Sequence, residues 1–396
     1  MTRPAYLGTG IHLAAWCMLG MGCGVSSVGP AVRDAPAERV PLIYGTDLFH
    51  PHDDPDDHFD LATVFALPEF DVRAILLDLG ERQQERPGRV PVEQMFTLTG
   101  RRAPYAVGLD EPLRSPADAG LDQPAESQRA IELLLATLRA SPRPVVVVTA
   151  GSVRDVCAAF NREPDLLREK IARLYINIGN LDASQEEWNV RLDRHAYVGI
   201  MRTGLPIYWC PCLPMNENRS THWKFRHDDL FDGMPLPLLN FFVYALQRVP
   251  PDEIDPMAAL RGDLRPWRHL LLPMERQMWC TGPLLHAAGR HVWRIGDDWI
   301  ASAEALSHPA PATSPADVAS SPPGIELADV FTFVPARVTV DDQGITQWAE
   351  FADNANMHVY KVLDPEHHTA ALRSCLRHLL HDFPQATDRP RVRPGA

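Results

Sequence analysis

Five short apolar runs constrain the fold of this chain more than any other feature. These candidate strands are Val40–Tyr44, Val72–Leu77, Val145–Thr149, Leu174–Ile178 and Pro206–Trp209. Their hydrophobicity is nearly continuous, as expected for strands that are buried on both faces of a sheet. Stretches with a helical pattern lie between them, at Asp57–Ala66, Glu126–Arg139, Ser152–Phe160, Asp165–Ala172 and Asp193–Thr203. The alternation predicts an α/β fold with a mostly parallel, Rossmann-like open sheet and helices on both of its faces.

An acidic run follows the first candidate strand. Residues 47–60 read DLFHPHDDPDDHFD, with six aspartates, three histidines and no lysine or arginine. Like charges this close repel each other, so the run is either solvated by water or neutralised by a cation. Ligands of open α/β sheets bind at the carboxyl ends of the strands, and the run begins at such an end. The sequence therefore predicts that the carboxylates lie on the binding face of the sheet.

The residues of this run allow three interpretations. Asp54 to Asp57 have the pattern of a helix start, with a capping aspartate, a proline in the first turn and acidic residues near the positive helix end. Asp47 and the histidines are not explained in this way. A hard-cation site is the second interpretation, because calcium prefers carboxylate and carbonyl oxygens. A transition metal held by imidazole and carboxylate groups is the third.

Composition narrows the class of partner. The chain has 396 residues, and a hydrophobic content of 45% is enough for a sizeable core. Its formal net charge is −13 at pH 7. This argues against nucleic acid as a partner, since a phosphate backbone binds basic surfaces. It also argues against a polybasic membrane-binding surface.

The N-terminal residues have the pattern of an export signal. Arg3 precedes the apolar run Ile11–Met21, which is too short to span a bilayer but long enough for a signal-peptide core. Leu19–Cys23 resembles a bacterial lipobox, in which the cysteine is acylated and becomes the new N-terminus. We therefore predict that residues 1–38 are a leader and tether, that the protein is exported to the periplasm or the extracellular space, and that a lipidated Cys23 tethers it to a membrane. The alternative is an extension with a few apolar residues and no targeting role.

The remaining residues predict one domain with an insertion and a tail. Residues 39–384 form the α/β domain, 307–324 are a low-complexity, disordered insertion, and 385–396 are a flexible tail. Residues 80–92 are polar and proline-containing and predict a loop. Asp341–Gly344 predicts a hairpin turn, and a final helix is expected near His367–His381. The seven cysteines have no disulfide or zinc spacing, and most are interpreted as core residues.

Several motifs follow one another at characteristic distances. Pro68-Glu69 stands eleven residues after Asp57, and residues 145–180 contain a strand, a threonine-glycine turn, a helix and a second strand. EWNV at 187–190 is followed by DRHA at 193–196, and residues 355–376 have the pattern of a last strand and helix. In order and spacing, these motifs resemble the inosine–uridine-preferring nucleoside hydrolases over roughly residues 40–384.

The resemblance implies a metal-dependent hydrolase that acts on the N-glycosidic bonds of nucleosides or related ribosides. Its cofactor would be Ca²⁺, bound by Asp47, Asp57 and the backbone carbonyl of Thr149, with Asp47 also acting as the general base. The implied ribose contacts are Asp56, Asn180, Glu187 and Asn189. The partner would be a small-molecule substrate, and the resemblance also suggests a homo-oligomer.

Two departures from the family pattern predict a non-standard metal site. Leu48–Pro55 separates Asp47 from the paired aspartates by eight residues where the family has three, so Asp53 or Asp54 could replace Asp47 as the first ligand. The family's His-Asp-Pro motif reads Thr281-Gly282-Pro283 here, and His222, His227 or His286 could replace the lost histidine. Two alternatives stay open: a catalytically inactive, nucleoside-hydrolase-like ligand-binding protein, and a structural protein with a solvated acidic loop.

Overall fold

The structure, a computed structural model, describes residues 38–52, 55–182, 186–215, 219–269, 271–306, 324–351 and 353–386. The described elements belong to one unit, residues 38–396. Several predictions lie outside the described residues: the leader with Cys23, the alternative ligands Asp53 and Asp54, nearly all of the low-complexity insertion, and the tail from residue 387. None of the described helices is long and apolar enough to cross a membrane.

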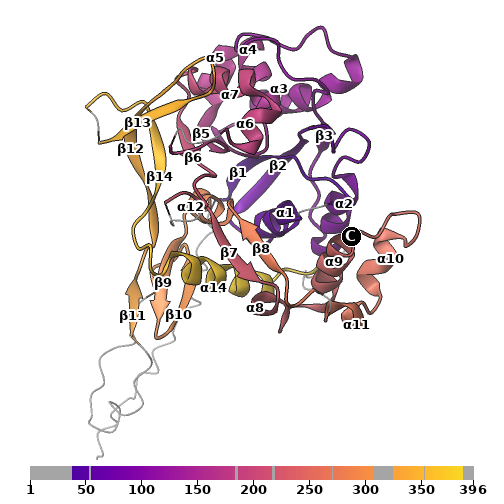
Figure 1. The fold of residues 1–396 in the computed structure, drawn as a ribbon. Helices are drawn as coiled ribbons and strands as arrows, with labels where there is room; N and C mark the ends of the chain where they lie inside the picture. The colour runs from indigo at the N-terminus through magenta and orange to yellow at the C-terminus, as the bar shows by residue number, and fades with distance from the viewer. Residues whose placement is uncertain are drawn as a thin grey trace, which may run out of the picture. The chain divides into compact units, whose positions relative to one another are not determined.

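The core of this unit is a nine-stranded sheet (Figure 1). From one edge to the other its strands are β13 (Thr346–Glu350), β12 (Phe331–Val340), β14 (Met357–Val362), β6 (Ile207–Cys210), β5 (Ile171–Asn177), β4 (Val145–Ala150), β1 (Val40–Thr46), β2 (Phe70–Leu77) and β3 (Tyr105–Val107). Seven of them, from β14 to β3, pair in parallel, and β12 is antiparallel to both of its neighbours. The predicted α/β class and mostly parallel sheet are confirmed.

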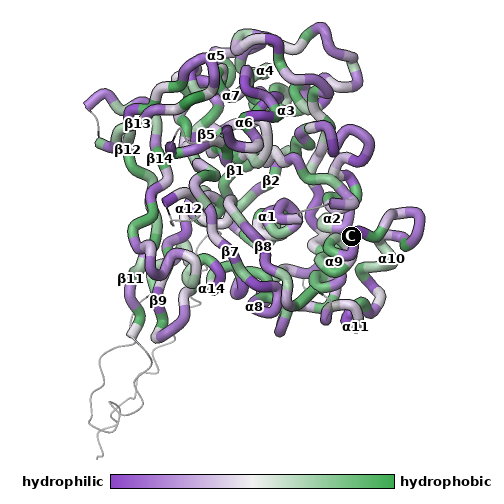
Figure 2. Tube along the Cα trace, in the orientation of Figure 1, coloured by the Kyte–Doolittle hydropathy of each residue, from purple (hydrophilic) through white to green (hydrophobic). Residues whose placement is uncertain are grey.

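Helices cover both faces of the sheet and bury two separate cores. Alternate residues of β1 point to opposite faces, since Leu42 and Tyr44 belong to one core and Ile43 to the other. The first core contains α1 (Asp56–Ala66), α2 (Arg89–Thr99), α9 (Leu236–Leu246), α12 (Thr281–Ala287) and α14 (His368–His381). The second contains α3 (Arg129–Ala140), α4 (Arg154–Arg162), α5 (Pro164–Lys170) and α7 (Arg194–Met201). Figure 2 shows hydrophobic residues along the central strands and α9.

Shorter elements complete the unit. Two small sheets pair β7 (Trp223–Arg226) with β8 (Glu275–Met278), and β9 (His291–Ile295) with β10 (Asp298–Ser302) and β11 (Ile325–Leu327). The short helices are η1 (Ala125–Gln128), α6 (Trp188–Leu192), α8 (Asp228–Phe231), α10 (Pro256–Arg261) and α11 (Arg265–Arg268).

The five predicted strands and the helices between them are present, with shifted boundaries. The predicted helix at Asp165–Ala172 ends at Lys170, because Ile171 already pairs with Val145 of β4. The predicted loop at 80–92 was wrong at its end, since α2 begins at Arg89. Pro91 lies in the first turn of α2, where a backbone N–H has no partner within the helix.

Candidate functional site

Four neighbouring strands end at the same level and form the floor of a cavity. Thr46 of β1 pairs with Ala150 of β4, Ala150 with Asn177 of β5, and Asn177 with Cys210 of β6. A cavity of about 560 Å³ opens at this edge of the sheet. Its acidic lining residues are Asp47, Asp56, Asp57, Asp60, Glu186 and Glu187. The carboxylates of the acidic run therefore line a cavity at the carboxyl ends of parallel strands, where ligands of such sheets bind.

Asp47 and Asp57 meet at the base of this cavity. The backbone N–H of Asp47 donates to the Ala150 carbonyl (3.0 Å), and Thr46 Oγ1 donates to Asp57 Oδ1 (3.1 Å). The two carboxyl groups are close enough for their charges to interact. Burial, followed by the charge of Asp78, raises the pKa of Asp47 to about 7. Burial and the charge of Asp47 raise the pKa of Asp57 well above its usual value. Two buried carboxyl groups this close retain a proton unless a cation balances their charge.

Two further residues with buried oxygens line the cavity: Asp60, which ends the acidic run, and Asn177, which the sequence did not single out. Asn177 donates through Nδ2 to the Thr149 carbonyl (2.9 Å), whereas its Oδ1 is buried without a hydrogen-bond partner. Asp60 Oδ1 is likewise buried without a partner, and burial raises the pKa of this carboxyl to about 7. Carboxylate and amide oxygens are the donors that a hard divalent cation prefers, so these residues fit such an ion.

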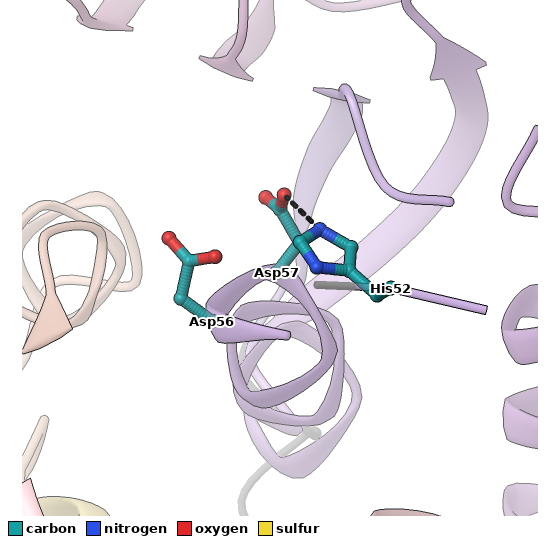
Figure 3. A group of neighbouring side chains, drawn as sticks. All are labelled: His52, Asp56 and Asp57. Carbon is teal, nitrogen blue, oxygen red and sulfur yellow. Dashed lines mark ion pairs between the residues drawn. The ribbon is translucent and has the colours of Figure 1, made fainter. Parts of the chain in front are cut away.

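His52 joins the carboxylates at the start of α1 (Figure 3). His52, Asp56 and Asp57 each offer one ligand atom, and these atoms lie within 4.8 Å of one another. His52 Nε2 is 3.9 Å from Asp57 Oδ2, which is too long for a hydrogen bond. Burial and the charge of Arg276 lower the pKa of His52 to about 3, so its imidazole is neutral at pH 7. Among the described histidines, His52 is the one that lines the cavity.

The long loop after β1 is packed against the protein. His50 Nε2 hydrogen-bonds the Val249 carbonyl (2.8 Å), and the His50 ring stacks on Tyr244 of α9 with centroids 4.8 Å apart. The His52 ring stacks on Phe49 (4.0 Å). The described part of the insertion, Leu48–His52, is therefore fixed by contacts, and Asp47 keeps its place at the base of the cavity.

Glu187 and Asn189 line the wall of the cavity beside β5. Glu187 caps α6 and accepts from the N–H groups of Asn189 (3.0 Å), Val190 (3.2 Å) and Gly179 (2.9 Å). Asn189 Nδ2 donates to the Asn177 carbonyl (3.1 Å). Both residues belong to the EWNV motif, from which the family resemblance implied them as ribose contacts.

Two of the sequence-predicted site residues do not line this cavity. Asn180 accepts a hydrogen bond from the Asp182 N–H through Oδ1 (3.1 Å). The Thr149 carbonyl accepts from Asn177, and its neighbour Ala150 lines the cavity instead. The structure thus brings together Asp47, Asp56, Asp57, Glu187 and Asn189.

The wall beside α12 lacks the side chains of the family motif. Gly282 is buried, and a Cβ at this position would lie 2.7 Å from the Tyr360 hydroxyl. Trp279 and Cys280 line the cavity from this side. The three histidines proposed as substitutes contact other groups: His286 the Tyr175 hydroxyl (2.8 Å), His222 the Gln277 side chain (3.2 Å), and His227 the Leu271 carbonyl (2.9 Å).

Comparison with known proteins places this chain in a family. The family model "Inosine-uridine preferring nucleoside hydrolase" matches residues 43–367. The pyrimidine-specific ribonucleoside hydrolase RihA of Citrobacter koseri is 32% identical over 231 residues, which cover 52% of this chain and 71% of the relative. RihA of Salmonella arizonae is 29% identical over 189 residues, which cover 42% of this chain and 58% of the relative.

A solved structure shares the fold. The plant nucleoside hydrolase PpNRh1 superimposes with a TM-score of 0.51 at 16% identity, covering 85% of this chain and 99% of the plant chain. At this identity the likeness concerns the fold alone. The match of the family model over most of the sequence decides the assignment: the chain belongs to the inosine–uridine preferring nucleoside hydrolase family and is a glycosyl hydrolase.

Proposed function

We propose that the chain hydrolyses the N-glycosidic bond of nucleosides or related ribosides with the help of a divalent cation. The observation that carries this proposal is the cavity at the strand ends, which is lined by Asp47, Asp57 and Asn177, whose Oδ1 is buried without a hydrogen-bond partner. A cation offsets the repulsion between these carboxylates and gives the amide oxygen a partner. Asp47 and Asp57 would hold it, with Ca²⁺ as the ion that the family resemblance implies.

The residues of the cavity suggest a division of tasks in the reaction. When bound, the cation lowers the pKa of a water molecule. Asp47 accepts a proton from the attacking water at its carboxylate, which lies at the base of the cavity. Glu187 offers negative charge to the oxocarbenium-like sugar of the transition state. Asn189 contacts a ribose hydroxyl.

Aromatic side chains provide the surface for the leaving base. Phe49, Trp188 and Trp279 all line the cavity. A nucleobase can stack on such faces, which fixes its orientation without selecting one base strongly. The wall beside α12 supplies no imidazole to protonate the base, so departure of the base depends on stabilisation of the sugar cation. The proposed site is therefore non-standard in that no imidazole beside α12 can protonate the leaving base.

The test is release of ribose from uridine and inosine by the full chain in the presence of a divalent cation. We expect turnover by the wild type and a loss of about 10²–10⁴-fold in kcat for Asp47→Asn, the usual contribution of a general base. Asp165→Asn is the matched control, because this carboxyl is fully exposed on α5. A wild-type chain that binds the cation but cleaves neither nucleoside would contradict the proposal.

The second candidate is a ligand-binding protein without catalysis. Gly282 favours it, because the wall beside α12 has lost both polar side chains of the family motif. It would bind a nucleoside without cleaving it, and Asp57→Ala would weaken the affinity with no rate to change. Export, a lipidated Cys23 and a homo-oligomer stay predictions of the sequence.

A further inference from the structure

We infer that His52 is a metal ligand together with Asp56 and Asp57, and that the site consequently prefers a divalent first-row transition ion to Ca²⁺. The inference deepens the proposed function and rests on it, because it concerns the metal ion of the same cavity. Its evidence is geometric: three side chains that converge, a residue of the same cavity with an unpaired buried oxygen, and a loop whose packing holds the imidazole.

The three side chains are close enough to share one ion. Their ligand atoms lie within 4.8 Å of one another, and His52 Nε2 and Asp57 Oδ2 are 3.9 Å apart. Two ligand atoms of a tetrahedral ion, each roughly 2.1 Å from the metal, lie roughly 3.4 Å from each other. Small side-chain rotations therefore suffice to close the site. Figure 3 shows the imidazole facing the Asp57 carboxylate, with Asp56 on the same end of α1.

A second element points to a ligand in the same cavity. Asn177 comes from β5, and its side chain is 1% exposed. Its Oδ1 is buried without a hydrogen-bond partner, and the residue lines the cavity that His52, Asp56 and Asp57 also line. A buried carbonyl oxygen without a partner costs free energy, so it indicates a bound group that supplies positive charge or a donor. A helix start alone would not place such an oxygen there.

Packing fixes the position of the imidazole. The His52 ring stacks on Phe49 with 27° between the ring planes, and it meets the edge of His58 at a centroid distance of 5.7 Å. The preceding His50 holds the loop on α9 through Tyr244 and reaches the Val249 carbonyl. A side chain held in this way loses little conformational freedom when it binds a metal.

The donor set decides which ion is favoured. Calcium takes six to eight oxygen ligands, whereas imidazole nitrogen suits zinc, cobalt, nickel, copper and iron. Trp279 and Cys280, which line the cavity near α12, add no side-chain oxygen. At Gly282 the Tyr360 hydroxyl occupies the space of a side chain. The loop after β1 thus offers the cavity a nitrogen ligand, whereas the lining residues next to α12 offer no side-chain oxygen.

The experiment is calorimetric titration of the metal-free full chain with Co²⁺ and, separately, with Ca²⁺. We expect the wild type to bind Co²⁺ at least about tenfold more tightly than Ca²⁺, as imidazole ligation favours transition ions. His52→Asn should lower the Co²⁺ affinity about 100-fold and change the Ca²⁺ affinity little. Loss of a residue that only hydrogen-bonds to a metal ligand already costs about 10–100-fold, so loss of a ligand should cost at least the upper value. His222→Asn is the matched control, since His222 packs on Trp279 outside the cluster, and it should bind both ions like the wild type.

Two results would overturn the inference: tighter binding of Ca²⁺ than of Co²⁺ by the wild type, or a His52→Asn variant that loses affinity for both ions equally or for neither. A direct measurement on the wild type guards against misfolding of the variant. In the proton NMR spectrum of the Co²⁺-loaded chain, a ligating imidazole gives a hyperfine-shifted, exchangeable N–H resonance, and its absence would also reject the inference.

These readouts are separate from turnover. If His52 ligates Co²⁺ but the loaded chain cleaves no nucleoside, the proposed hydrolysis fails and the metal assignment stands. If the chain cleaves nucleosides with Ca²⁺ bound and His52→Asn changes neither titration, the hydrolysis stands and the metal assignment fails.

Discussion

Gly282 shows how one residue limits what a wall of the cavity can contain. A Cβ at this position would lie 2.7 Å from the Tyr360 hydroxyl and 3.1 Å from Tyr360 Cε2. The hydroxyl is held by a hydrogen bond to His368 Nε2 (2.7 Å), so it cannot move aside without losing that bond. The position therefore excludes side chains for a steric reason, in addition to lacking a carboxylate.

We expect Gly282→Ala to destabilise the protein by about 1–3 kcal/mol, because the new methyl group overpacks against Tyr360. In a Tyr360→Phe background the same substitution should cost clearly less, since the contacting hydroxyl is gone. Urea denaturation of the two single variants and the double variant measures this coupling. An equal cost in both backgrounds would show that Tyr360 is not the obstacle.

Asp155 is a buried carboxyl outside the cavity that holds a proton. Its Oδ1 accepts from the Leu109 N–H (3.0 Å), and its Oδ2 is buried without a partner. Burial, followed by the charge of Asp78, raises its pKa from the ordinary value of 3.8 to about 7. Between these values the folded chain binds a proton that the unfolded chain releases. The stability from this proton is complete at low pH and is lost as the pH rises through the folded pKa.

Asp155→Asn should therefore stabilise the protein at high pH. The amide still accepts from the Leu109 N–H but carries no charge, so we expect a gain of roughly 1–4 kcal/mol at pH 8 and almost none near pH 4. Urea denaturation at pH 4.5, 6 and 8 checks the trend. Asp165→Asn should show no such trend, and a gain for Asp155→Asn that is the same at each pH would contradict the explanation.

At the scale of elements, one buried ion pair joins α4 to α7. Arg154 Nε and Asp193 Oδ2 are 2.9 Å apart, with side chains 2% and 0% exposed. Arg154 also donates to the carbonyls of Leu79 (2.8 Å) and Leu192 (3.1 Å). Asp193 caps α7 by accepting from the Ala196 N–H (2.9 Å). The pair thereby fixes α7, and with it α6, beside the cavity.

Removal of the Arg154 guanidinium from this ion pair should destabilise the protein. We expect Arg154→Leu to lower the free energy of unfolding by about 3–5 kcal/mol, because Asp193 would stay buried without a partner charge. Lys224→Leu is the comparison, since its pair with Glu275 is about half exposed and is expected to contribute about 0–1 kcal/mol. Urea denaturation of both variants measures the two losses in free energy of unfolding. A small loss of similar size for both variants would mean that the buried pair does not join the helices.

The elements also show what the sequence can and cannot reveal. The five candidate strands were recognised because runs such as Val145–Thr149 are apolar at every position, a pattern set by burial on both faces. The start of α2 was missed because Pro87 and Pro91 surround it and signal a loop. Asp47 and Asp57 were found from spacing along the chain. Asn177 was not, since its role depends on which strands lie side by side.

At the scale of the whole unit, the strand order explains why the cavity lies where it does. From β1 the chain first adds β2 and β3 on one side and then β4, β5 and β6 on the other. The helix after β1 packs in one core and the helix after β4 in the other. The segments that leave neighbouring strand ends therefore diverge, and a crevice opens between them. The candidate site lies at this point of reversal, between β1 and β4.

Cation binding should stabilise the whole unit, because carboxyl groups crowd this crevice. A cation present at 100 times its dissociation constant adds about 2.7 kcal/mol to the free energy of unfolding, which raises the melting temperature by several degrees. A chelator should reverse the effect. Scanning calorimetry at several cation concentrations measures the rise in melting temperature. A melting temperature that does not change with cation concentration would contradict a cation site in this crevice.

The Asp57→Asn variant distinguishes two effects at this site: the repulsion between buried carboxyl groups and the binding of the cation that offsets it. Without a cation, the variant should melt above the wild type near neutral pH, because folding of the wild type must protonate a buried carboxyl or bury its charge, and the amide requires neither. With a cation the order should reverse, since the variant lacks a ligand and gains almost nothing. This reversal in the order of the two melting temperatures requires both the crowded carboxyl groups and the metal site. A variant that melts below the wild type under both conditions would mean that Asp57 stabilises the fold through its bond to Thr46 alone.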